Sequence, residues 1–305
     1  MVTNFKKNKV KFVAPWQDSQ SITKLLINQF KTSEIDLSNI EFVYDDSYDI
    51  IVYNNYITEE PKKDSKSYIF FHEPSWNGSH QKDFFKYNDL IVYGFSENLY
   101  NAKNIIELPS HMFYGGRGTW CEGWNFWTFN SLNKEFNKTK KISSIVSKLG
   151  EKNESIPKGC LYRERFNLIK NLISKFNNID FYGWGKNNSN LKGDLIEKKD
   201  ALEQYKFSIC IENSNEKNYI SEKFYDCILT DTIPIYYGCK NIKEIWPEKG
   251  YILLEDITNL ESVSKTIKNI EQNTDSIYHE MLPELRKIKK RYFEENNLLK
   301  LINNL

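Results

Sequence analysis

The amino-acid sequence predicts an α/β protein with two doubly wound domains, each built on a parallel sheet. Its 305 residues are enough for two domains of ordinary size. Short apolar runs suited to buried strands alternate with stretches of helical periodicity in both halves of the chain. Because strand, helix and strand in succession form a βαβ unit, we expect both sheets to be parallel.

Composition narrows the class of protein. The 42 basic and 41 acidic residues nearly cancel, so the chain lacks the basic excess of a nucleic-acid-binding protein. No run approaches the ~20 apolar residues of a transmembrane segment, and the polar residues 1–11 do not form a signal peptide. Five cysteines, an odd number, share no metal-ligand spacing. We therefore expect a soluble, cytoplasmic protein without disulfides, with Cys210 and Cys227 as small core residues.

The first domain is expected over residues 1–138. Its one clear helix is predicted near Ser21–Phe30. Asp45 and Asp46 could hold a divalent metal, but Asp-Asp-Ser before a strand favours a turn. The expected strands are Val10–Val13, Ile40–Tyr44, Ile50–Tyr53, Tyr68–Phe71 and Leu90–Gly94.

The second domain is expected over residues 139–276. Helices are predicted to start near Leu161 and after Ser221, and a Gly-x-Gly turn at Gly183–Gly185 would let backbone approach a ligand closely. A helical segment over residues 277–305 is expected to return to the first domain. The expected strands are Ile142–Ser147, Ile179–Tyr182, Phe207–Ile211, Thr232–Tyr237 and Ile252–Leu254.

Charged residues gather where the strand Phe207–Ile211 ends and the next helix begins. Ser221 can cap that helix, and Lys223 lies in its first turn. A cation there opposes the helix dipole unless an anion is bound, although a solvated surface lysine is the alternative. Glu212 or Glu222 can accept hydrogen bonds from a ribose diol. Together these groups suit a nucleotide diphosphate sugar.

Three segments of this region resemble the donor-binding signature of the α-1,3-fucosyltransferases, glycosyltransferase family 10. They are Glu212-Asn-Ser214, Tyr219-Ile-Ser-Glu222-Lys223 and Ile233-Pro-Ile-Tyr-Tyr-Gly238. The resemblance implies the GT-B architecture, in which two doubly wound domains face a cleft. It also implies inverting transfer of L-fucose from GDP-fucose to a hydroxyl of a glycan. The donor-binding residues that it implies here are Glu212, Asn213, Tyr219, Glu222 and Lys223.

The resemblance implies further contacts to the donor phosphates. Ser147 matches a serine whose loop meets them, although Lys148 stands where the family has asparagine. Arg163 matches the phosphate-binding arginine by its spacing before Phe166, and Arg165 is the alternative. An arginine that starts a helix again needs an anion, and its planar fork suits a diphosphate.

A general base is expected after the strand Tyr68–Phe71. Pro74 holds Glu73 extended, and the resemblance implies that Glu73 takes the acceptor proton. His72 is the rival, because its unperturbed pKa already suits a base. His80 and His111 have weaker claims.

The remaining expectations concern metal, acceptor and class. No obligatory metal is expected, because Arg163 and Lys223 would neutralise the departing diphosphate. The aromatic side chains of residues 120–129 suit either a sugar acceptor groove or an interdomain seam. The expected partners are a nucleotide sugar and a glycan acceptor, with no nucleic acid. Two alternatives stay open: the same fold with another GDP- or UDP-sugar, and a catalytically silent glycan-binding protein.

Overall fold

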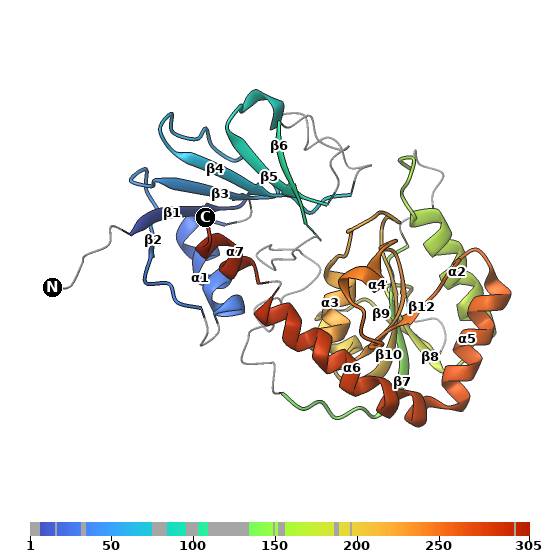
Figure 1. Ribbon diagram of the computed structural model, residues 1–305. Coiled ribbons are helices and arrows are strands. Elements are labelled where there is room, and N and C mark those ends of the chain that lie inside the picture. The colour runs from blue at the N-terminus through green and yellow to red at the C-terminus, as the bar shows by residue number, and fades with distance from the viewer. Residues whose placement is uncertain are drawn as a thin grey trace. The chain divides into compact units, whose positions relative to one another are not determined.

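The computed structural model divides the chain into two compact α/β units (Figure 1). Described residues up to 108, together with Arg291–Leu305, belong to unit 1, and those from 134 to Lys290 belong to unit 2. The structure describes residues 7–15, 17–31, 35–74, 84–95, 103–108, 134–148, 150–151, 156–185, 189–195, 197–295 and 297–305.

Unit 1 is built on a parallel sheet with the strand order β2-β1-β3-β4-β5-β6. Every residue of β3 is buried, as expected for an inner strand of a parallel sheet. The strands are β1 (Asn8–Val13), β2 (Ile40–Phe42), β3 (Ile50–Asn54), β4 (Lys66–Phe70), β5 (Leu90–Gly94) and β6 (Asn104–Glu107), with a short 3₁₀ helix, η2 (Phe84–Lys86).

The C-terminal helix α7 (Leu298–Asn303) lies beside α1 (Ser19–Phe30) in unit 1 (Figure 1). Helix α1 starts where Asp18 accepts a hydrogen bond from the backbone N–H of Ser21 at 2.9 Å. Asn297 caps α7 and donates a 2.6 Å hydrogen bond to the carbonyl of Phe30. The expected return of the C-terminal helix to the first domain is confirmed.

Unit 2 is built on a second parallel sheet, with the strand order β12-β11-β10-β7-β8-β9. Its strands are β7 (Lys140–Ile145), β8 (Ile179–Tyr182), β9 (Leu191–Gly193), β10 (Tyr205–Ile211), β11 (Ile233–Tyr237) and β12 (Ile252–Leu253). Its helices are α2 (Tyr162–Lys175), the 3₁₀ helix η5 (Lys198–Ala201), α3 (Glu222–Leu229), α4 (Ile242–Ile245), α5 (Leu260–Gln272) and α6 (Thr274–Glu294), which continues into unit 1.

Some helices and turns can be compared with those expected from the sequence. The helical segment over residues 277–305 is two helices, because Asn297 caps a new helix three residues after α6 ends. Asp45 forms the expected turn, since its carboxylate accepts from the Ser47 N–H at 3.0 Å, while Asp46 pairs with Lys11. Within the described residues, no helix combines the length and the apolar character needed to cross a bilayer.

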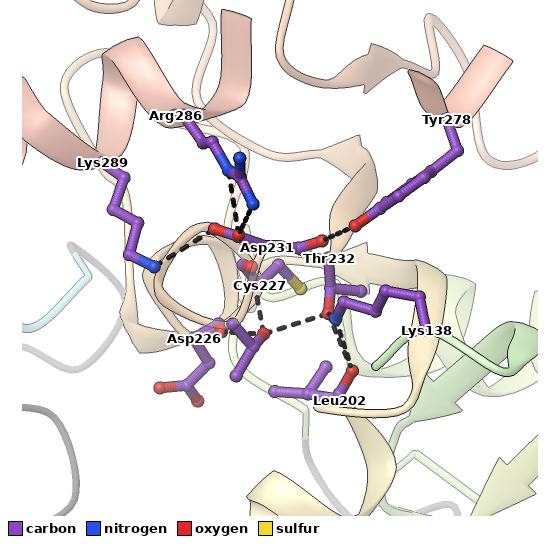
Figure 2. A network of polar contacts seen from close by, with 10 residues as sticks. Lys138, Leu202, Asp226, Cys227, Asp231, Thr232, Tyr278, Arg286 and Lys289 are labelled. Carbon is purple, nitrogen blue, oxygen red and sulfur yellow. Dashed lines mark hydrogen bonds and ion pairs between the residues drawn. The ribbon is translucent and has the colours of Figure 1, made fainter. Parts of the chain in front are cut away.

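Asp231 fixes the far end of α3 against α6 (Figure 2). It adopts a left-handed conformation (φ 55°), and its buried carboxylate binds the guanidinium of Arg286 at 2.9 Å and the ammonium of Lys289 at 3.1 Å. The Tyr278 hydroxyl donates to the Asp231 carbonyl. Beside it, Lys138 donates to the Thr232 hydroxyl at 2.8 Å. Burial lowers the pKa of Lys138 to about 7, although the charge of Asp231 acts to raise it.

Candidate functional site

In the unit 2 sheet, β8 and β9 follow β7 on one side, whereas β10, β11 and β12 lie on its other side. The order of the strands therefore switches direction between the neighbouring strands β7 and β10. Ligands of open parallel sheets bind beyond the carboxyl ends of the strands at such a switch point. Ser147 follows β7, whereas Glu212 and Asn213 follow β10 directly. Three of the predicted donor-binding residues therefore lie at this edge of the sheet.

Glu212 is fully buried and binds the start of α3. One carboxylate oxygen accepts from the backbone N–H of Ser221 at 2.7 Å, and the other accepts from the Ser221 hydroxyl. Burial raises the pKa of Glu212, while the charge of Lys223 acts to lower it. Because Ser221 caps α3 through its own side chain, Glu212 sets where this helix begins.

Gly238, at the end of the next strand, packs directly on Glu212. A Cβ atom at this position would lie 2.2 Å from Cγ of Glu212, which no real side chain tolerates. The Gly238 carbonyl also accepts a hydrogen bond from Asn215, and the amide groups of Asn218 and Asn241 bond each other at 2.8 Å. These contacts bind the loop between β10 and α3, which contains the buried Tyr219, to the loop after β11.

The two candidate arginines lie in very different surroundings. Arg165 is 4% exposed, and its Nη1 donates to the side-chain oxygen of Asn213. Its Nε is buried without a hydrogen-bond partner, and no carboxylate in the described chain lies within ion-pair distance of it. Burial lowers the pKa of Arg165, which reflects the cost of holding a charge out of water. Arg163 is exposed.

Helical phase explains this difference. Arg165 precedes Leu168, Ile169 and Leu172 by three, four and seven residues, so it shares their buried face of α2. The start of α2 is also bound to the loop after β10, because the Leu161 N–H donates to the Asn213 carbonyl at 2.8 Å. The sequence pattern and this bond together direct Arg165 toward the switch point.

Lys223 and Glu222 form an ion pair in the first turn of α3, with the ammonium 2.9 Å from one carboxylate oxygen. The same oxygen lies 3.7 Å from the ammonium of Lys198, which is 2.8 Å from Asp226. Burial acts to raise the pKa of Glu222, but Lys223 and Lys198 outweigh it and hold that pKa well below its usual range. Both Glu222 and Lys223 keep about a fifth of their side chains exposed, at 21% and 19%. This turn therefore presents a fixed anion and a fixed cation to solvent.

The loop after β7 is supported by the turn after β8. Gly183 has φ 83°, and a Cβ atom there would lie 3.1 Å from the carbonyl oxygen of Val146. The indole of Trp184 donates a 2.7 Å hydrogen bond to that same oxygen and stacks on Phe166 of α2. The Gly-x-Gly turn thus brings its backbone close to Val146, the residue that precedes Ser147. Ser147 itself is half-buried.

The predicted base lies in unit 1, next to the switch point between β1 and β3. Asn55 follows β3 in a left-handed conformation (φ 65°), which asparagine tolerates better than most residues. Its side-chain oxygen accepts from the backbone N–H of His72 at 2.7 Å, and its amide donates to a Glu73 oxygen at 3.4 Å. Burial raises the pKa of Tyr56, and the nearby charge of Glu73 raises it further.

Glu73 and its rival differ in exposure. Glu73 is half-buried, whereas His72 is buried and its Nε2 lies 3.2 Å from the side-chain oxygen of Asn54. A base must reach its substrate proton, and of these two side chains Glu73 is the more accessible to solvent.

Three residues of these sites were not singled out by sequence reasoning: Lys198, Trp184 and Asn55. Lys198 is one of two consecutive lysines in a polar segment, and nothing in that segment marks it. Asn54 and Asn55 do carry a signal, since paired amides directly follow a buried strand. The aromatic residues of 120–129, with His80, His111 and Cys121, lie outside the described residues. No cluster of three or more potential metal ligands occurs among the residues that are described.

A family model for the C-terminal region of glycosyltransferase family 10 (fucosyltransferase) matches residues 136–295, more than half of the chain. This match covers all but the first two described residues of unit 2, and it includes every predicted donor-binding residue.

Curated relatives match over shorter segments. An α-(1,3)-fucosyltransferase of Helicobacter pylori is 31% identical over 117 residues, or 37% of this chain and 24% of the relative. One of Caenorhabditis elegans is 37% identical over 134 residues, or 41% of this chain and 34% of the relative. A putative fucosyltransferase-like protein of Arabidopsis thaliana is 32% identical over 110 residues, or 36% and 21%. The matches thus span between 21% and 34% of each relative's length.

Solved structures resemble the whole chain. A crystal structure of an α1,3-fucosyltransferase with GDP matches with a TM-score of 0.52 and 17% identity, over 97% of this chain and 92% of the other. An α-glucosyltransferase solved with UDP-glucose and DNA matches with a TM-score of 0.56 and 9% identity, over 94% and 96%. At such identities the likeness concerns the fold alone, and it confirms the expected GT-B fold.

Proposed function

Because the chain belongs to glycosyltransferase family 10, we propose that it transfers L-fucose from GDP-fucose to a hydroxyl group of a glycan acceptor. The observation that carries this proposal is the buried guanidinium of Arg165, which has no carboxylate partner in the described chain and lies at the switch point of unit 2. A buried charge of this kind calls for an anion, and a nucleotide diphosphate supplies one.

The phosphate contacts follow from the two fixed cations. Arg165 and Lys223 would bind the diphosphate and neutralise the charge that develops on it as the sugar departs. Each such contact supplies roughly 3 kcal/mol of transition-state stabilisation. The exposure of Arg163 and the direction of Arg165 toward Asn213 support Arg165 as the phosphate-binding arginine of the two.

The ribose contact is assigned in the same way. Glu212 is 0% exposed and its oxygens bind Ser221, whereas Glu222 reaches solvent and Lys223 and Lys198 hold its pKa well below its usual range. A carboxylate that stays ionised accepts two hydrogen bonds from a vicinal diol. This supports Glu222 as the ribose acceptor and Glu212 as the residue that fixes the start of α3.

The reaction is a single displacement with inversion at the anomeric carbon. The acceptor oxygen forms a bond to that carbon while the bond to the phosphate oxygen breaks, and the bonding electrons leave with GDP. The acceptor proton passes to Glu73, whose half-buried carboxylate bonds the Asn55 amide. Because Arg165 and Lys223 stabilise the leaving group, we expect no obligatory metal.

A glycan array incubated with labelled GDP-fucose and purified protein tests the proposal. Transfer of label to a defined glycan is the expected result, and unlabelled GDP-mannose, GDP-glucose and UDP-sugars should compete weakly. Transfer from another nucleotide sugar but not from GDP-fucose would support the proposed donor site and show that the donor carries a different sugar. Glycan binding with neither transfer nor donor hydrolysis would contradict catalysis altogether.

A further inference from the structure

Lys198 lies outside every segment of the donor signature, yet it contacts α3 at two carboxylates. It starts η5, a 3₁₀ helix that immediately precedes β10. Its ammonium is 2.8 Å from a carboxylate oxygen of Asp226 and 3.7 Å from one of Glu222. Glu222 and Asp226 are four residues apart, so they lie on one face of α3 and repel each other. Lys198 lies between these two negative charges.

The two carboxylates that lie near Lys198 differ in their exposure to solvent. The side chain of Asp226 is 3% exposed, whereas that of Glu222 is 21% exposed. Asp226 is thus a fixed point within the protein, and Glu222 is the end that a ligand can reach. An ammonium held by the buried carboxylate restricts the other one to a narrow range of positions.

Helix α3 itself is fixed at both ends. Glu212 binds Ser221 at its start, and Asp231 binds Arg286 and Lys289 just after its end. Figure 2 shows Asp226 on this helix; its backbone carbonyl accepts a hydrogen bond from the Thr230 hydroxyl, which in turn bonds the Thr232 hydroxyl. Lys198 therefore holds Glu222 relative to a rigid element and not to a mobile loop.

We propose that Lys198 is a positioning residue of the donor site, which holds the Glu222 carboxylate in place to accept hydrogen bonds from the ribose hydroxyls of the nucleotide. This rests on the proposed function, because it takes the donor to be a ribonucleotide sugar bound at α3. In this role Lys198 acts through Glu222. Without it, Glu222 would lose one of the two ammonium groups that lie close to its carboxylate.

The test compares the dissociation constants of GDP and 2′-deoxy-GDP, measured by isothermal titration. Wild-type protein should prefer GDP, and Lys198→Met should reduce that preference roughly tenfold, the effect of one hydrogen bond to a charged group. Lys198→Arg should restore it in part. The matched control is Lys199→Met, which removes the neighbouring lysine of η5, an ion-pair partner of Glu197, and should leave the preference unchanged.

Loss of Lys198 removes an ammonium group from the buried carboxylate of Asp226, which lowers the stability of the single variant. The double variant Lys198→Met/Asp226→Asn removes the charge as well and should fold while showing the same reduced preference. A wild-type preference in the folded double variant, together with a lost preference in Glu222→Gln, would overturn the role of Lys198 alone. Equal binding of both nucleotides by wild-type protein would instead overturn the donor site and this inference with it.

Discussion

The carboxyl edges of the two parallel sheets have different chemistry at corresponding points of their topology. In unit 2 the edge is charged: Arg165, Glu222 and Lys223 lie there, and burial or ion pairing fixes each of them. In unit 1 the edge is formed by the amides of Asn54 and Asn55, which bond His72 and Glu73. One edge holds a buried or paired charge at each of these positions, and at the other edge a side-chain amide bonds the Glu73 carboxylate.

This difference matches what each half of the proposed reaction requires. A site for a diphosphate needs cations that are already fixed, so that no ordering cost falls on binding. A base must instead change its protonation state during the reaction, and a strong ion pair would hold it ionised. The amide of Asn55 orients the Glu73 carboxylate through a hydrogen bond. We therefore expect variants of the two edges to separate into binding defects and rate defects.

The largest effect, a loss of transfer rate without a loss of GDP binding, is expected for Glu73→Gln. The variant keeps the shape of the side chain but cannot take a proton, so transfer should fall by roughly 10²–10⁴. Titration should show nearly unchanged GDP affinity, because the residue belongs to unit 1. His72→Gln is the control for the rival base and should keep most of the transfer rate. The reverse pattern would assign the base to His72, and loss of GDP affinity in both variants would make this strand end structural.

Arg165 and Arg163 provide a matched pair on one helix. Arg165→Met should weaken GDP binding by the ~1.5–3 kcal/mol of a hydrogen bond to a charged group, or about 10–150-fold. Arg163→Met should change it by less than about twofold, because its side chain is exposed. Isothermal titration of GDP gives both values, and thermal melting shows whether Arg165→Met stays folded. A large effect at Arg163 with none at Arg165 would reverse the assignment.

Lys138, a residue of unit 2, should make the free energy of unfolding depend on pH. Its folded pKa of about 7 lies below the ~10.4 of an unfolded lysine, so between these values the unfolded chain binds one more proton. The free energy of unfolding should therefore rise with pH, by up to ~1.4 kcal/mol per unit, between pH 7 and pH 9.

Lys138→Met should remove this contribution, which urea unfolding of the wild type and the variant at pH 7, 8 and 9 can measure. The difference between the two proteins is the relevant quantity, because other groups titrate equally in both. An equal slope in both proteins would show that Lys138 stays protonated in the folded state.

Asn55 tests whether the edge of unit 1 depends on its side chain or on its backbone. Asn55→Gly keeps the left-handed conformation but loses the amide, so transfer should fall by about fivefold, the effect of one long hydrogen bond worth ~1 kcal/mol. Asn55→Ala loses the same amide and adds ~1–2 kcal/mol of backbone strain, so it should also melt earlier. Transfer rates at saturating donor and melting temperatures separate the two effects. Full activity in Asn55→Gly would remove Asn55 as a positioning residue for Glu73.

The smallest effect is expected from metal removal. EDTA should change the transfer rate by less than about twofold, a barrier change below ~0.5 kcal/mol. A hundredfold loss restored by manganese would mean that the cations of unit 2 do not suffice for the leaving group.

The helical phase of α2 shows how far sequence reasoning reaches. The motif spacing indicated Arg163, yet the spacing of Arg165 from Leu168, Ile169 and Leu172 was also in the sequence and placed it on the buried face. The same periodicity was available for α5, whose buried residues Val263, Ile267 and Ile270 were not used to predict a helix. The short strands β6 and β9 carry too few residues for any period to be recognised.

The sequence by itself determined the fold class, most of the inner strands and the family, because buried strands and fixed signature residues are local patterns. Tertiary structure decided what each charged side chain does, because charges act through space across segments far apart in the chain. It buried Glu212 against Ser221, directed Arg165 to Asn213 and brought Lys198 to Asp226, a residue 28 positions away. The energy of a charge depends on its exposure and its neighbours, and only the folded chain sets both.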